Sequence, residues 1–92
     1  MPSPVVELNR AVAVGMAFGP LAALELVDAL SSEPALSGYY LLPTVRGDLL
    51  ARLGRDEEAR IEFDRAASLT QNSRQRASLL ERMAESSAQN GA

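Results

Sequence analysis

The stretch of sequence that decides the fold is GDLLARLGRDEEARIEFDRA, residues 47–66. Its first half ends in a leucine followed by a glycine, the usual closing residue of a helix. In its second half, small and aromatic residues recur at four- and three-residue spacing, which places them on one face of a helix. The stretch therefore predicts two antiparallel helices joined by a tight turn and packed through five positions: Gly47, Gly54, Ala59, Phe63 and Ala66.

The same pattern occurs once before in the chain. Phe18-Gly19 precedes Leu53-Gly54 by 35 residues. Three further residues, Ala23, Val27 and Leu30, precede Ala59, Phe63 and Ala66 by 36 residues each. Repeats of this period, with small and aromatic residues at fixed steps, are typical of tetratricopeptide units. The second unit is nearly complete and lacks only the final proline, where Gln71 stands; the first is degenerate.

We therefore expect an all-α fold, a tetratricopeptide-like right-handed array of two antiparallel helical hairpins plus a C-terminal capping helix, with five helices in total. Residues 1–92 are expected to form one domain. Its parts are repeat one at about 5–31, repeat two at about 39–70, the capping helix at about 73–86 and a frayed tail at 87–92. No segment alternates with the two-residue period of a strand.

Turn residues predict how individual helices begin. Gly19-Pro20 separates the first two helices, and Pro43 must lie in the first turn of the third. Asp56 is expected to cap the fourth helix, and Asn72 with Gln75 has the form of a capping box. The face of the fifth helix is predicted from Ala77, Leu80, Met83 and Ser87.

Composition excludes most catalytic chemistry. Apolar residues make up 47% of the chain but aromatic residues only 4%, so Ala, Leu and Val must fill the core. The chain has no Cys, no His and no Lys, and it therefore lacks the residues of most metal sites and most nucleophile and base pairs. We expect no enzymatic activity, no cofactor and no metal.

Charge and hydropathy narrow the possible partners. The net charge is −3, whereas nucleic-acid binders carry a basic stripe, so direct contact with DNA is not expected. The longest apolar run, from Ala11 to Phe18, is far shorter than the ~20 residues that cross a membrane. We expect a cytoplasmic protein with no membrane contact.

The first helix of each hairpin is expected to line a concave surface. The candidate protein-contact residues on this groove are Asn9, Met16, Leu41, Thr44, Asp48 and Arg52, with Val6, Ala13 and Ala51 beside them. The groove is mixed in character. Only Asn9 and Arg52 match the Lys, Asn and Arg set that grips a peptide carboxylate in some tetratricopeptide adaptors, so a peptide C-terminus is not the favoured ligand.

The tyrosine pair keeps two interpretations, whereas one is favoured for four of the arginines. Tyr39 and Tyr40 are half of all the aromatic residues, and they either cover the core or form an exposed contact. Four arginines are expected to form solvated bridges to Glu7, Asp48 or Glu81, each worth about 0–1 kcal/mol. They are Arg10, Arg46, Arg76 and Arg82.

Two segments, PVVELNRAVAV at 4–14 and GYYLLP at 38–43 continuing through RGDLLARLGR at 46–55, carry a family resemblance. Both resemble the C-terminal extension of a group of bacterial extracytoplasmic-function RNA polymerase sigma factors. In that group, promoter-reading domains precede a tetratricopeptide-like region. The resemblance covers residues 3 to about 83. It is looser in the fifth helix, where Gln75 and Ser78 replace an acidic and an aromatic residue.

The resemblance implies a fragment of a longer sigma factor that lacks the domains that bind polymerase and read the promoter. Its implied function is a regulatory protein-interaction domain that modulates transcription initiation without contacting DNA. The implied partners are the sigma domains of the same chain, RNA polymerase or a co-regulator. An uncovered apolar end face could also produce a homodimer of the fragment. The alternative is a free-standing tetratricopeptide adaptor whose concave groove binds a peptide or helix.

Overall fold

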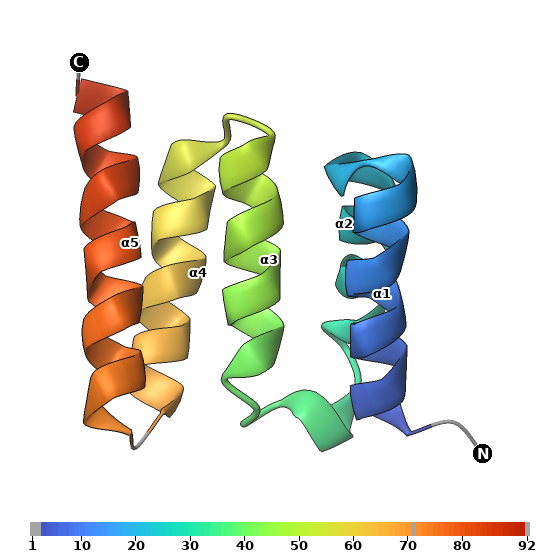
Figure 1. The fold of residues 1–92 in the computed structure, drawn as a ribbon. Coiled ribbons are helices and arrows are strands. Elements are labelled where there is room, and N and C mark those ends of the chain that lie inside the picture. Colours follow the sequence, from blue (N-terminus) through green and yellow to red (C-terminus); the bar gives the residue numbers. More distant parts are fainter. Residues whose placement is uncertain (1–2, 71, 92) are drawn as a thin grey trace.

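The computed structural model describes residues 3–70 and 72–91, and for 85–91 it describes the backbone alone. Within these residues the chain forms five α-helices and no strand, which confirms the all-α prediction. Figure 1 shows them as α1 (Pro4–Phe18), α2 (Pro20–Leu30), α3 (Leu41–Arg52), α4 (Asp56–Leu69) and α5 (Ser73–Gly91). One turn of 3-10 helix, η1 (Pro34–Leu36), lies in the loop between α2 and α3.

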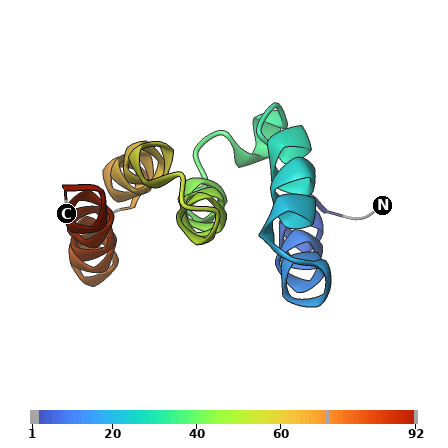
Figure 2. The ribbon, with the colours of Figure 1, turned by 90° about the horizontal axis from the view of Figure 1, so that it is seen from above.

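The helices form two layers, with α1, α3 and α5 in one layer and α2 and α4 in the other (Figure 2). Packing is closest between α1 and α2, between α3 and α4 and between α4 and α5, while α2 also packs on α3. Helix α3 touches α1 only slightly and is set back between α1 and α5. The result is a tetratricopeptide-like array of two hairpins and a capping helix, whose first layer is concave.

The second hairpin closes around Phe63, which is 1% exposed. A Cβ atom added to Gly47 would lie 2.7 Å from Cε1 of this ring, so the ring occupies the space that a side chain on α3 would need. Ala59 and Ala66 lie on the same face of α4 and are fully buried. The turn between the helices has φ +77° at Gly54, a conformation that glycine adopts without strain. The repeat positions therefore lie where the helices meet.

The first hairpin packs through smaller side chains. A Cβ atom added to Gly15 would lie 2.9 Å from the Ala23 Cβ, so α1 and α2 lie too close at this point for a side chain on residue 15. Gly19 has φ +96° between the helices, and Pro20 begins α2. Sequence reasoning missed Gly15 because the repeat signature has its glycine earlier in the helix.

The prediction that Asp56 caps α4 is wrong. The capping position is Arg55, which makes no side-chain cap hydrogen bond, and Asp56 is the first residue of the helix. The reason is the short turn, because only Arg55 separates Gly54 from α4. Asp56 still lies in an acidic first turn with Glu57 and Glu58, where the positive end of the helix dipole favours carboxylates.

The predicted capping box at α5 forms only in part, because its glutamine has another partner. Asn72 Oδ1 accepts hydrogen bonds from the backbone N–H of Arg74 (2.9 Å) and of Gln75 (3.2 Å). The Gln75 side chain instead donates through Nε2 to Tyr40 Oη (2.7 Å) and accepts at Oε1 from Thr70 Oγ1 (2.8 Å). This bridge ties the start of α5 to the start of α3.

The structure distinguishes between the two predicted roles of the tyrosine pair, a cover of the core and an exposed contact. Tyr39 and Tyr40 are half-buried and pack against the core, with their rings edge to face and 6.1 Å between centroids. Together with the hydrogen bond from Gln75, this makes them a cover of the core at the start of α3.

The predicted buried face of α5 is wrong by about one residue. Leu79 is 4% exposed and Met83 packs partly on the core, whereas Leu80 is 41% exposed and Ala77 is exposed. The contacts of Gln75 and Arg82 turn the face that contains Leu79 towards α3 and α4. The Ser87 side chain lies outside the described residues.

The end of α5 differs from the expected frayed tail. The helix continues through residues 87–91, because no proline or glycine interrupts the sequence before Gly91. Ala92 lies outside the described residues, as does Gln71, the position of the missing signature proline.

Candidate protein-binding groove

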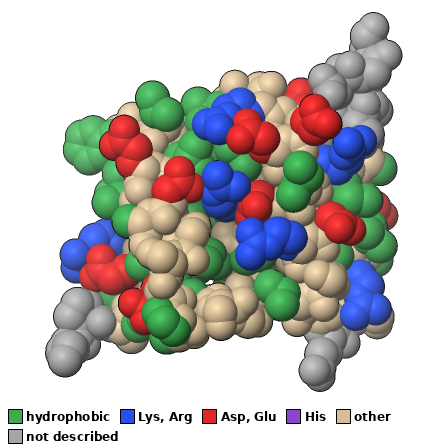
Figure 3. All heavy atoms as spheres, turned by 180° about the vertical axis from the view of Figure 1, so that it is seen from behind, with side chains coloured by type: hydrophobic (Ala, Val, Ile, Leu, Met, Phe, Trp, Pro, Cys, Tyr) green, Lys and Arg blue, Asp and Glu red, His purple; other side chains and the backbone are tan. Residues whose placement is uncertain are grey.

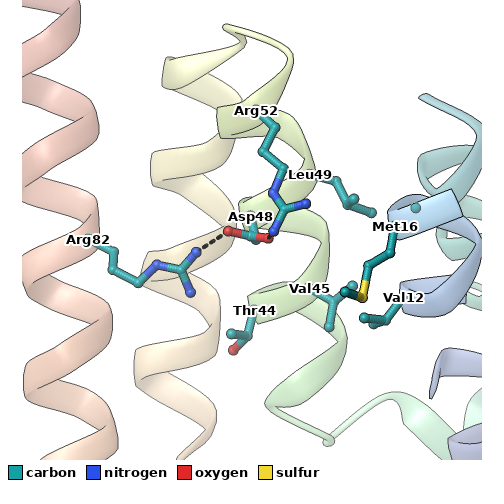
Figure 4. A pocket seen from close by; sticks show the side chains of 9 residues that line it. Val12, Met16, Thr44, Val45, Asp48, Leu49, Arg52 and Arg82 are labelled. Carbon is teal, nitrogen blue, oxygen red and sulfur yellow. Dashed lines mark hydrogen bonds and ion pairs between the residues drawn. The ribbon is translucent and has the colours of Figure 1, made fainter. Parts of the chain in front are cut away.

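A groove of about 330 Å³ lies on the concave face between α1 and α3 and reaches α5. It exists because α3 is set back and touches α1 only slightly. Figure 4 shows its side chains converging from three helices. Its lining consists of Val12, Gly15 and Met16 from α1, Thr44, Val45, Asp48, Leu49 and Arg52 from α3, and Arg82 from α5.

One half of this concave groove is apolar. Met16 and Val12 point from α1 towards Val45 and Leu49 on α3 (Figure 4). Met16 is 81% exposed, which is unusual for a large apolar side chain beside other apolar residues. A partner that covers these side chains removes their apolar surface from water, which favours binding. Methionine is also well suited to contact, because its flexible side chain adapts to different partners.

The other half of the groove is charged and centred on Asp48. Its Oδ1 accepts a hydrogen bond from Arg82 Nη2 (2.5 Å), and its Oδ2 pairs with Arg52 Nη2 (3.1 Å). The Arg82 guanidinium also lies over the Phe63 ring, 4.5 Å from the centroid. Two cations therefore share one anion, and this half of the groove carries a net positive charge.

The structure brings together four of the six predicted contact residues: Met16, Thr44, Asp48 and Arg52. Asn9 is exposed on α1 and does not line the groove, and Leu41 is half-buried against the core at the start of α3. The three residues named beside them, Val6, Ala13 and Ala51, also lie outside the lining.

Arg82 is the groove residue that sequence reasoning assigned only to a surface bridge. The repeat signature places contact positions on the first helix of each hairpin, and α5 was interpreted as a cap. The signal that could have found it is the spacing of 34 residues from Asp48 to Arg82, which is the length of one tetratricopeptide unit and close to the offsets of 35 and 36 residues between the two repeats. On the concave face, α5 thus occupies the position that the first helix of a third hairpin would have.

On the opposite face, which Figure 3 shows, acidic and basic side chains are interspersed. Arg46 links three helices there: its Nε donates to Asp28 Oδ1 (2.8 Å) and its Nη1 pairs with Glu62 Oε1 (3.2 Å). Burial acts to lower the pKa of Arg46, but the hydrogen bond to Asp28 and the charge of Glu62 outweigh it and raise this pKa. Glu62 is 5% exposed and also pairs with Arg65. The charges of this cluster are compensated within the fold.

The predicted arginine bridges have mixed outcomes. Arg10 pairs with Glu7 (3.6 Å) and Arg82 with Asp48, both within the expected set of acids. Arg46 pairs with other acids, and Arg76 donates to the backbone carbonyls of Ala67 and Thr70 at the end of α4. Sequence spacing missed the partners of Arg46 and Arg76 because they lie on neighbouring helices.

Neither a metal-binding cluster nor a membrane-spanning helix occurs in the described part of the chain. Residues 3–70 and 72–91 contain no group of three or more His, Cys, Asp or Glu side chains that could hold a metal ion. None of the helices described is both long enough and apolar enough to cross a membrane.

The chain is similar to a protein of Rhizobium meliloti (strain 1021) that is described only as uncharacterized. The two are 55% identical over 71 residues, which are 77% of this chain and 16% of the relative. The chain therefore spans about a sixth of the length of the curated relative it matches. No protein-family model matches the chain, and no solved structure matches it.

Proposed function

We propose that this chain is a regulatory protein-interaction domain of an extracytoplasmic-function RNA polymerase sigma factor. It modulates transcription initiation through protein contacts on its concave groove, and it neither binds DNA itself nor catalyses a reaction. The observation that carries the proposal is the groove between α1 and α3, whose apolar half includes the exposed side chains of Met16 and Val12.

The sequence segments that resemble the sigma-factor extension support this role. Residues 4–14 form most of α1, and residues 38–55 contain all of α3. These are the two helices that enclose the groove. The quoted segments therefore include residues of both helices that carry the proposed contact surface.

The relative from Rhizobium meliloti supports a role within a larger protein. A segment 55% identical to this chain makes up 16% of that protein. A domain embedded in so long a chain is placed to act on the rest of that chain or on its partners. We propose the sigma domains of the same chain, RNA polymerase or a co-regulator as these partners.

Charge supports protein rather than nucleic acid as the ligand. A DNA-binding surface needs unpaired basic side chains that replace counterions along phosphates. Here the net charge is −3, and Arg46 and Arg65 are compensated by Asp28 and Glu62 on the α2/α4 face.

The test is promoter-dependent transcription in vitro by the full-length Rhizobium protein with bacterial core RNA polymerase. Deletion of the matched 71 residues should abolish or clearly change the amount of transcript. Circular dichroism of the deleted protein serves as the folding control. Transcript levels equal to those of the intact protein would overturn the proposal.

A free-standing adaptor that binds a peptide or helix is the second candidate function, and the same groove supports it. Binding of a peptide to the chain, combined with no effect of the segment on transcription, would favour this candidate.

A further inference from the structure

We infer that the concave groove recognises a short protein segment in which a large apolar side chain stands next to one or more carboxylates. The inference rests on the proposed function, because it specifies the partner chemistry of that same groove. It follows from the shape of the groove, from its division into two halves and from its unbalanced charge.

The apolar half accepts the apolar side chain. Met16 is 81% exposed and Val12 is 39% exposed, and both face Val45 and Leu49 across the gap (Figure 4). Gly15 adds no side chain to this part of the lining. A partner side chain that enters here removes apolar surface on both helices from water, which favours binding.

The charged half accepts the carboxylates. Arg52 and Arg82 each use Nη2 for Asp48, and their Nε and Nη1 donors have no partner among the described residues. Arg52 is 55% exposed, so its remaining donors face solvent. A guanidinium with free donors binds carboxylates in a fixed geometry, often through two parallel hydrogen bonds. Thr44 adds a hydroxyl to the same lining.

The size of the groove is compatible with a short peptide segment. A volume of about 330 Å³ lies near the lower end of the ~300–1,000 Å³ that small-molecule sites occupy. It fits one large side chain with a neighbouring carboxylate. A groove that opens onto a helical face also lets the remainder of a peptide continue past it.

The charge of the groove contrasts with that of the whole chain. The chain carries −3, yet the charged residues of the groove lining are two arginines and one aspartate. On the opposite face, Arg46 is compensated by Asp28 and Glu62. Charge complementarity therefore directs an acidic segment to the groove, and it acts mainly on specificity and on the rate of association.

The test is selection of a random linear peptide library, displayed on phage, against the immobilised chain. The expected result is enrichment of peptides with Leu, Met or Phe next to Asp or Glu. In titrations of an enriched peptide, Arg52→Gln should weaken binding about fivefold, as for a partly exposed ion pair. Met16→Ser should weaken it about tenfold through lost apolar contact.

Matched variants on α1, outside the groove lining, control for the loss of a charge and of an exposed apolar side chain. Arg10→Gln removes an exposed arginine outside the groove lining, and Phe18→Ser removes a side chain that is 79% exposed and also outside it. Both should bind the enriched peptide as the unchanged chain does. A charge reversal, Arg52→Glu, should shift the selection from acidic to basic peptides.

Three outcomes would overturn the inference: no enrichment, enrichment of apolar peptides flanked by Lys or Arg, or equal losses in the groove and control variants. Binding of octanoate at the groove without peptide enrichment would point instead to a small carboxylic acid. The selection uses no polymerase, so its failure is distinguishable from failure of the transcription test of the proposed function.

Discussion

The two hairpins share a repeat but differ in how they use their apolar residues. In the second hairpin, Phe63 is enclosed by Gly47 and by the Arg82 guanidinium. In the first, α1 passes close to Ala23 of α2 at Gly15, which has no side chain. Among the described residues, seven of the ten exposed large apolar side chains lie on this first hairpin: Val5, Val6, Val12, Met16, Phe18, Leu21 and Leu26.

This difference separates stability from recognition. The second hairpin, with α5 packed on it, buries a large aromatic side chain and thereby stabilises the array. The first hairpin leaves apolar side chains in solvent, where a partner can cover them. The groove lies at the boundary, because Met16 belongs to the first hairpin and Arg52 to the second.

The largest expected effect is removal of the aromatic core of the second hairpin. Phe63→Ala should lower the free energy of unfolding by about 3–5 kcal/mol, because it leaves a cavity in a closed core. The control is Ile61→Ala on the same helix, where the side chain is 54% exposed and the loss should stay below about 1 kcal/mol. Urea unfolding measures both. Similar losses for the two variants would contradict a core centred on Phe63.

The next largest effects should come from alanine substitutions of the closely packed glycines, and the loss of stability should be greater in the second hairpin than in the first. Gly47→Ala forces a Cβ atom against two Phe63 ring atoms at 2.7 and 2.8 Å and should cost about 1–3 kcal/mol. Gly15→Ala meets one atom below 3.0 Å and should cost about 1 kcal/mol. Gly38→Ala, with nothing within 4 Å, is the control and should stay within about 0.5 kcal/mol. A neutral Gly47→Ala would show that the ring tilts away freely.

The attachment of α5 to the second hairpin should depend on one hydroxyl group. Tyr40→Phe removes the acceptor of the Gln75 Nε2 hydrogen bond and should cost about 1 kcal/mol. Tyr39→Phe keeps the neighbouring ring and removes a hydroxyl that takes no part in this bridge. Hydrogen exchange at the start of α5 should accelerate in the Tyr40 variant alone. Unchanged exchange would mean that Leu79 and Arg82 are enough to hold the helix.

The smallest effect concerns the turn of the second hairpin. The hydrogen bond from Arg55 (2.6 Å) lowers the pKa of Glu58. A lowered pKa in the folded state gives a stabilisation that is complete above the unfolded pKa of about 4.3 and is lost as pH falls through the folded pKa. Glu58→Gln should therefore reduce the acid-induced fall of Tm below pH 4.3. Glu57→Gln controls for net charge, and equal slopes for both variants would contradict the pairing.

Local patterns in the sequence predicted the helices, their turns and the small and aromatic positions of the second hairpin. They were less successful where contacts join distant helices. The orientation of α5 depends on Gln75 meeting Tyr40 and on Arg82 meeting Asp48, so the buried residue is Leu79 and not Leu80. Such pairings decide between faces that helical periodicity alone leaves nearly equivalent.

The groove was predictable to the extent that it follows the repeat. Met16, Thr44, Asp48 and Arg52 lie on the expected layer and come together. Asn9 and Leu41 do not, because the gap between α1 and α3 opens beside only part of each helix. Arg82 required the recognition that α5 continues the repeat period.

The most direct test of the central claim measures whether substitutions in the groove change transcription. In the full-length Rhizobium protein, the matched segment is replaced by the whole of this chain, with and without Met16→Ser and Arg52→Gln. The account predicts that these groove variants change promoter-dependent transcription, whereas the control pair Phe18→Ser and Arg10→Gln does not. Equal transcription from the groove and control variants would contradict the claim that this domain acts through its concave groove.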